Sequence, residues 1–186
     1  MLFRSIGIDS DGCVFDSMEV KHKECFCPNF VKHFRFAGAA KYVREVWDFV
    51  NLYGRSRGCN RFHAVIKSMD YLKKRPEIVA RKIKVPELPK LREWVARETK
   101  LGNPALEAVV RETFDPELSQ VLGWSVDVNR TVEETVSDVP PFPGVEDVLK
   151  AAAPKADMIV VSQTPLEALV RERSEEHTSE LQSPNT

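Results

Sequence analysis

Two carboxylates stand two residues apart near the beginning of the chain, directly after a short apolar segment. The segment is Leu2 to Ile8, and the acids are Asp9 and Asp11, followed by Gly12. An apolar run that stops at an acidic stretch with a glycine is typical of a strand ending in a loop, so both side chains should reach one site. A carboxylate can attack phosphorus, and a second carboxyl can move protons. These residues predict phosphoryl transfer, with Asp9 as nucleophile and Asp11 as general acid and base.

The same acids could also hold a metal ion. The carboxylate of Asp9 and the backbone carbonyl of Asp11 are hard oxygen ligands, which suit Mg²⁺. We therefore predict a Mg²⁺ cofactor with Asp9 and Asp11 as metal ligands. The alternatives are a solvated turn and a calcium loop. An EF-hand loop closes with Glu at its twelfth position, where Val20 stands when counting begins at Asp9.

The acidic stretch resembles the first motif of the haloacid dehalogenase (HAD) superfamily of phosphohydrolases, Asp-x-Asp-Gly-x-x-x-Asp-Ser. Cys13 departs from that motif, in which Thr or Val is usual. The dehalogenase branch lacks the second acid, so the resemblance implies a phosphatase. The matching residues are Asp9, Asp11, Gly12, Asp16 and Ser17.

A second apolar segment is predicted to be a buried strand like the first. It covers Met158 to Val161 and ends at Ser162, after which Thr164 and Pro165 favour the start of a helix. A hydroxyl beside free amides at a helix N-terminus makes an anion site. The alternative is a well-capped helix without a ligand. The segment is similar to the second HAD motif, and this implies that Gly12, Ser162 and Gln163 bind phosphate.

Between the two motifs the chain reads as helical. Apolar residues recur at steps of three and four, as at Val43, Val46 and Val50, and no strand is predicted there. The resemblance implies an α/β fold: an incomplete Rossmann-like HAD core of parallel strands, with an all-helical C1 cap inserted between motif one and motif two. We therefore expect the partial core in residues 1–16 and 139–172 and the helical cap domain in residues 17–138.

One segment of the expected cap is rich in arginine. Arg55, Arg57, Asn60 and Arg61 lie in a glycine-flanked turn between predicted helices. Guanidinium groups bind phosphates and carboxylates through paired hydrogen bonds, so these residues are candidates for substrate recognition. The alternative is a solvated loop in which each arginine meets backbone carbonyls or nearby glutamates.

The final residues, 173–186, have one leucine and no apolar period. They resemble the translation of a sequencing adapter, and we expect a non-native tail; the alternative is a genuine disordered tail. HAD enzymes also use a Lys in a third motif and an acidic pair in a fourth. We identify neither here. The resemblance thus implies a C-terminally truncated member of the C1-capped, phosphoglycolate phosphatase-like type, and the fragment is expected to be inactive.

Composition limits the other classes of function. A net charge of -1 over 186 residues argues against nucleic-acid and anionic-membrane partners, and no apolar run is long enough to span a membrane. We expect a cytoplasmic protein with reduced cysteines. A zinc site at His22, Cys25 and Cys27 is an alternative, although this spacing fits no common structural zinc pattern. The sequence does not predict the oligomeric state.

The functional prediction is a Mg²⁺-dependent phosphatase that hydrolyses a small phosphorylated metabolite through an aspartyl-phosphate. One alternative is a phosphomutase of the same fold, which returns the phosphoryl group to a sugar. The other is a non-catalytic helical binding module, suggested by the missing Lys and acidic pair.

Overall fold

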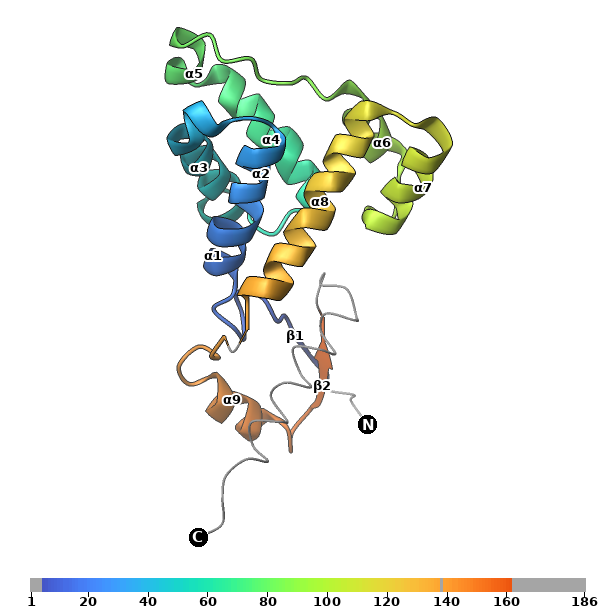
Figure 1. Ribbon diagram of the computed structural model, residues 1–186. Helices are drawn as coiled ribbons and strands as arrows, with labels where there is room; N and C mark the ends of the chain where they lie inside the picture. The colour runs from blue at the N-terminus through green and yellow to red at the C-terminus, as the bar shows by residue number, and fades with distance from the viewer. Residues whose placement is uncertain (1–4, 138, 162–186) are drawn as a thin grey trace. The chain divides into compact units, whose positions relative to one another are not determined.

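The computed structural model describes residues 5–137 and 139–161, and the chain divides into two compact units (Figure 1). One unit contains Met1–Met18 and Val136–Thr186, and the other contains Glu19–Thr135. We call them the strand unit and the helical unit. The assignment of these units as the core and the cap of the resembled family stays a prediction.

The strand unit contains two short parallel strands. β1 (Ser5–Ile8) pairs with β2 (Asp157–Val160), with Ile8 opposite Val160, and the amide of Val161 donates to the carbonyl of Ile8 at 2.8 Å. The helix α9 (Val145–Ala152) precedes β2 and begins after Gly144, which has a φ of 81°. The predicted strand at Met158 to Val161 is therefore confirmed to within one residue.

The predicted fold class is wrong. The described residues are mostly helical, and their only strands are β1 and β2, each four residues long. A Rossmann-like sheet needs several parallel strands with both faces covered by helices. The predicted burial of the strands is also wrong, since Ile6 is 41% exposed and Ile159 is 52% exposed. An apolar run shows that a strand could be buried, whereas burial itself depends on neighbouring elements.

The helical unit is built from short helices. The chain enters it through α1 (Met18–Val20), which contains the boundary between the units. The α-helices that follow are α2 (Cys27–His33), α3 (Ala40–Asp48), α4 (Arg61–Lys74), α5 (Pro76–Ala80), α6 (Pro89–Arg97), α7 (Asn103–Thr113) and α8 (Pro116–Thr135). A 3₁₀ turn, η2 (Ala37–Ala39), and two π-helical segments, η1 (Lys21–Phe26) and η3 (Phe49–Tyr53), complete it.

Local signals explain where the longer helices begin. The side chain of Asn60 accepts from the amide of Phe62 at the start of α4, and that of Asp115 accepts from the amides of Glu117 and Leu118 at the start of α8. The N-cap of α7 is Gly102, and no side chain caps this helix. Pro76 is the first residue of α5, a position at which the missing amide hydrogen of proline costs nothing.

An aromatic core holds the helical unit together. Trp47 on α3, Phe30 on α2 and Trp124 on α8 are fully buried, and their rings lie 4.8 to 6.5 Å apart. Figure 1 shows α2 beside α8, the pairing on which this cluster is built. Large aromatic rings bury more area than any other side chains, so the cluster dominates the apolar stabilisation of this unit.

Candidate functional site

Asp9 and Asp11 lie in the loop that follows β1, as predicted from their place after an apolar run. Asp9 is exposed and its Oδ1 accepts from the amide of Ser10 at 2.9 Å. Asp11 is half-buried. Gly12 has a φ of 73°, a conformation that glycine adopts without strain, and its amide donates to the carbonyl of Phe15 at 2.8 Å. The loop is therefore a hydrogen-bonded turn that carries both acids.

Ser17 is a partner of Asp11 to which the sequence assigned no role. Its hydroxyl donates to Oδ1 of Asp11, and the serine is buried. A hydroxyl donor at a carboxylate limits the rotation of that carboxylate. Ser17 thus orients Asp11, and its place in the acidic motif was the signal that could have identified it.

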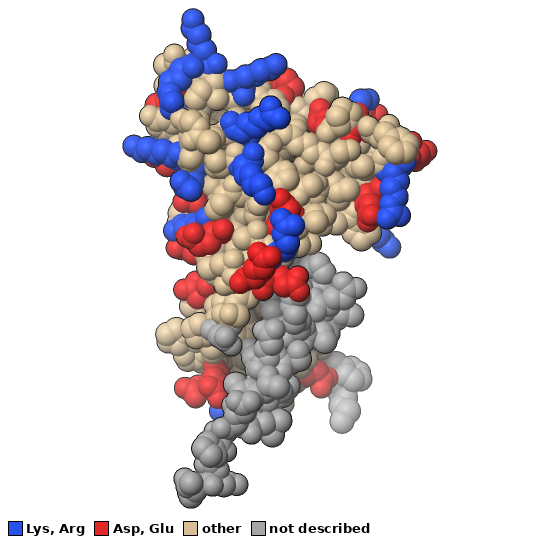
Figure 2. All heavy atoms as spheres, in the orientation of Figure 1, with Lys and Arg blue, Asp and Glu red and all other residues tan. Residues whose placement is uncertain are grey.

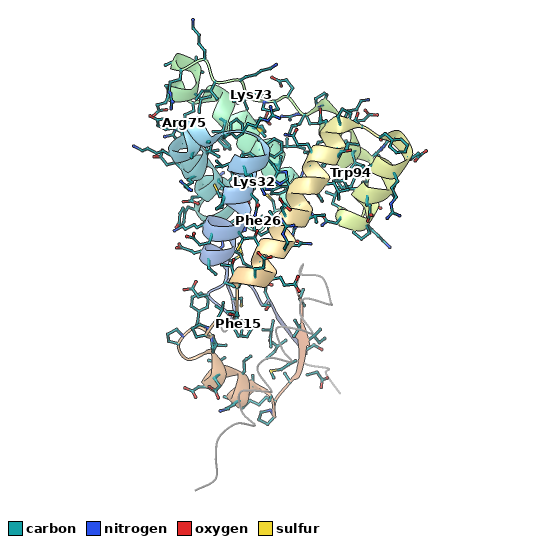
Figure 3. The ribbon with its side chains drawn as sticks, viewed as in Figure 1. Phe15, Phe26, Lys32, Lys73, Arg75 and Trp94 are labelled. Carbon is teal, nitrogen blue, oxygen red and sulfur yellow. The ribbon has the colours of Figure 1, made fainter. Side chains whose placement is uncertain are left out.

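A second segment of the strand unit closes the loop from the other side. The amide of Phe142 donates to the carbonyl of Val14 at 2.8 Å, and Phe15 forms an isolated antiparallel bridge with Pro141. Figure 3 shows Phe15 in this loop. Contacts with residues that are distant in the sequence therefore hold the loop in place. The acids stand on a backbone that is held at both ends.

Two of the predicted phosphate-binding residues, Ser162 and Gln163, lie outside the described residues. The parallel register still defines the strand end that they follow. Because Ile8 is opposite Val160 and β1 runs parallel to β2, Asp9 and Val161 continue from the same edge of the pair. The sequence-based expectation that these strands are parallel agrees with this pairing.

The oxygen atoms of this turn are of the kind that binds Mg²⁺, but they are few. The described residues contain no group of three or more His, Cys, Asp or Glu side chains that could hold a metal ion. Mg²⁺ commonly uses only one or two carboxylates and completes its shell with water and substrate phosphate. The hard oxygens of Asp9 and Asp11 in one turn meet that requirement. They do not resemble the closed nitrogen and sulfur set of a structural zinc site.

The remaining candidates lie in the helical unit, in the loop between η3 and α4. Arg55 and Arg57 are exposed, and neither forms an ion pair with a described residue. Asn60 has a local structural role, because its Nδ2 donates to the carbonyl of Leu101 at 3.1 Å while its Oδ1 caps α4. Asn60 therefore fixes the end of the loop, and a contact between it and a substrate stays a prediction.

Arg61 is a cation without an acid partner among the described residues. Its Nη1 donates to Oγ of Ser125 at 3.0 Å and to Oδ1 of Asn129 at 2.7 Å, and its guanidinium lies 5.0 Å from the ring centre of Phe26. Burial lowers the pKa of Arg61 to about 10. The group stays charged at neutral pH, and an anion would recover the solvation that burial removes.

Sequence reasoning missed the groups that hold Arg61. Ser125 and Asn129 lie four residues apart on α8, so they share one face of that helix. No local signal in the sequence indicates this contact, because Arg61 lies more than sixty positions from both residues and on another helix.

Comparison with known proteins found no family model, no curated protein and no solved structure that matches the chain. The resemblance to the HAD superfamily thus rests on the residues themselves. None of the described helices combines the length and the apolar character needed to cross a membrane.

Proposed function

We propose that the chain carries the acid pair of a Mg²⁺-dependent phosphoric monoester hydrolase that acts on a small phosphorylated metabolite. The observation that supports this most directly is the turn after β1. Asp9 and Asp11 stand together in that turn, and Ser17 orients Asp11. The register of β1 and β2, from which Asp9 and Val161 continue at the same edge, supports it further.

In the first step a carboxylate oxygen of Asp9 attacks phosphorus. The bond between phosphorus and the leaving oxygen breaks, and the carboxyl of Asp11 gives that oxygen its proton. In the second step the carboxylate of Asp11 takes a proton from water. The water oxygen bonds to phosphorus, inorganic phosphate leaves, and Asp9 and the protonated Asp11 are regenerated.

Asp9 and Asp11 would hold the Mg²⁺ ion, which when bound offsets phosphate charge. In the helical unit, Arg57 and Arg61 are the cations that we propose as anion-binding residues. Arg61 suits this role because neutral partners hold it on one side and no described carboxylate competes for it.

The test is phosphorylation of Asp9, which does not require many turnovers. The chain is incubated with 4-nitrophenyl phosphate and Mg²⁺, quenched in acid and digested, and the peptide that contains Asp9 is examined by mass spectrometry. We expect one phosphoryl group on Asp9. In the Asp11→Asn variant the phosphorylated form should accumulate. Nitrophenolate can leave without receiving a proton, whereas the water that attacks the aspartyl-phosphate needs a base.

The matched control is Asp157→Asn, which changes an exposed acid at the opposite end of the paired strands. It should be phosphorylated as the parent chain is, and Asp9→Asn should not be phosphorylated. If the peptide carried no phosphoryl group in any of these chains, or carried it equally in Asp9→Asn, the proposed chemistry would be wrong.

A further inference from the structure

The helical unit contains a surface groove that is separate from the residues discussed above. Its volume is about 420 Å³, and it lies where α3 and η3 meet the junction of α4 and α5. Figure 3 shows Arg75 at this junction. The lining residues come from both sides and are Glu45, Val46, Phe49, Tyr71, Lys74, Arg75, Pro76 and Glu77.

One wall of the groove is aromatic. The rings of Phe49 and Tyr71 meet edge to face with their centres 5.3 Å apart, and the two residues are 48% and 47% exposed. Half-exposed aromatic rings beside a buried aliphatic floor, here Val46, are typical of protein interfaces, in which such rings provide most of the binding energy.

The acids of the groove are already paired. Arg75 forms ion pairs with Glu45 and, at 3.1 Å, with Glu77, and its guanidinium lies 5.2 Å from the ring centre of Tyr42. Lys74 lines the groove, and Lys41 lies one turn before Glu45 on the same face of α3. The lining residues thus carry two acids and two cations and are together neutral, and Lys41, with which no described carboxylate pairs, adds a positive charge beside them.

The surroundings extend this positive charge. Residues 71–84 contain six cations and one acid, Glu77, although the whole chain has a net charge of -1. Figure 2 shows Lys and Arg gathered over the end of the helical unit that carries α5. A field of this sign attracts an acidic partner and repels a basic one.

The geometry points to a docking groove for an acidic segment of another protein, which places an apolar side chain against Phe49 and Tyr71 and carboxylates near Lys41 and Lys74. Nucleic acid fits less well. The edge-to-face rings leave no pair of parallel faces between which a base could stack. This inference does not depend on the proposed phosphatase activity.

The probe is a fluorescein-labelled peptide of glutamates around a central Leu-Phe pair, and fluorescence anisotropy measures its binding to the full chain. We expect saturable binding that weakens as salt is raised. Lys74→Glu should weaken it by about tenfold, since reversing one charge beside an acidic ligand costs that order of affinity. Tyr71→Ala should weaken it comparably. Lys100→Glu, an exposed cation on another part of the helical unit, should leave it unchanged.

Circular dichroism melts accompany each variant. If Tyr71→Ala melts at a lower temperature than the parent chain, Lys74→Glu remains the informative variant, because Lys74 is exposed and pairs with no described acid. The inference is overturned if a peptide with lysine in place of glutamate binds equally well, or if neither variant affects binding. It is also overturned if a single-stranded oligonucleotide or anionic vesicles displace the peptide and bind more tightly, because the surface would then serve polyanions in general.

Discussion

At the scale of single residues, the absence of a side chain at Gly54 determines how η3 ends. The amide of Gly54 donates to the carbonyl of Phe49 at 2.6 Å, and a β-carbon on Gly54 would lie 2.4 Å from that same oxygen. The chain therefore turns out of the π-helical segment only where the residue has no side chain. The turn leads directly into the loop that carries Arg55 and Arg57.

Gly54→Ala should lower the free energy of unfolding of the helical unit by about 1–3 kcal/mol, because backbone must shift to relieve the clash. Gly38→Ala is the matched control, since its β-carbon would approach nothing closer than the Arg81 guanidinium at 4.0 Å. It should stay within about 0.5 kcal/mol of the parent chain. Urea unfolding followed by circular dichroism measures the free energy of unfolding of both variants. Equal stabilities would show that the backbone can leave η3 in another conformation without cost.

At the scale of elements, a charge cluster joins α2 to α8. Oδ2 of Asp127 lies 2.8 Å from Nε2 of His33 and 3.1 Å from Nζ of Lys32, and Oδ1 lies 2.6 Å from Arg130. Figure 3 labels Lys32 on α2. The hydrogen bond with His33, and then that with Lys32, hold the pKa of Asp127 below its usual 3.8.

A lowered pKa means that the folded state favours the charged carboxylate. The stabilisation is therefore present above pH 3.8 and is lost as the pH falls through the folded pKa. Asp127→Asn should lower stability by about 1 kcal/mol at pH 7, a value limited by solvent screening. The difference should shrink below pH 3.8.

Thermal or urea unfolding at about pH 2.5 to 7 tests this prediction, because the difference in stability should change as Asp127 titrates. Glu112→Gln, an exposed acid on α7 without a described partner, is the control and should match the parent chain throughout. A loss in Asp127→Asn that stayed constant through the acid range would assign the effect to packing.

At the scale of the whole molecule, the two units differ in what they bury. Every residue of the apolar core cluster of the described chain lies between Cys27 and Val128, inside the helical unit. The strand unit instead exposes Val148, Ile159 and Val161, at 66%, 52% and 59%. The helical unit therefore has the contacts needed to fold by itself.

We expect residues 19–135, expressed alone, to keep the helical circular dichroism of the chain and to melt cooperatively within about 4 °C of the helical transition of the full chain. Trp124→Ala should destabilise the isolated unit and the full chain alike, by about 3–5 kcal/mol, because both share this core. A broad, non-cooperative melt of the isolated unit would contradict its independence.

Much of the local structure was predictable, and particular residues show why. Asp115 before Pro116 marks the start of α8, since a capping side chain and a proline act within one turn. The spacing of Val43 and Val46 predicted the apolar face of α3.

The candidate site was predictable in its parts. The sequence placed Asp9 and Asp11 after a strand, which the structure confirms. It did not place Ser125 and Asn129 around Arg61, because that contact joins α4 to α8 across more than sixty positions of sequence. Hydrogen bonds between distant segments leave no local periodicity.

By itself, the amino-acid sequence determined where helices begin, where the two strands lie and which acids follow the first of them, since each depends on neighbours within a few positions. Only the tertiary structure decided that the strands are exposed, that the α/β prediction fails and that Arg61 meets neutral partners. Burial and charge pairing depend on which distant segments come together, and that is a property of the packed chain.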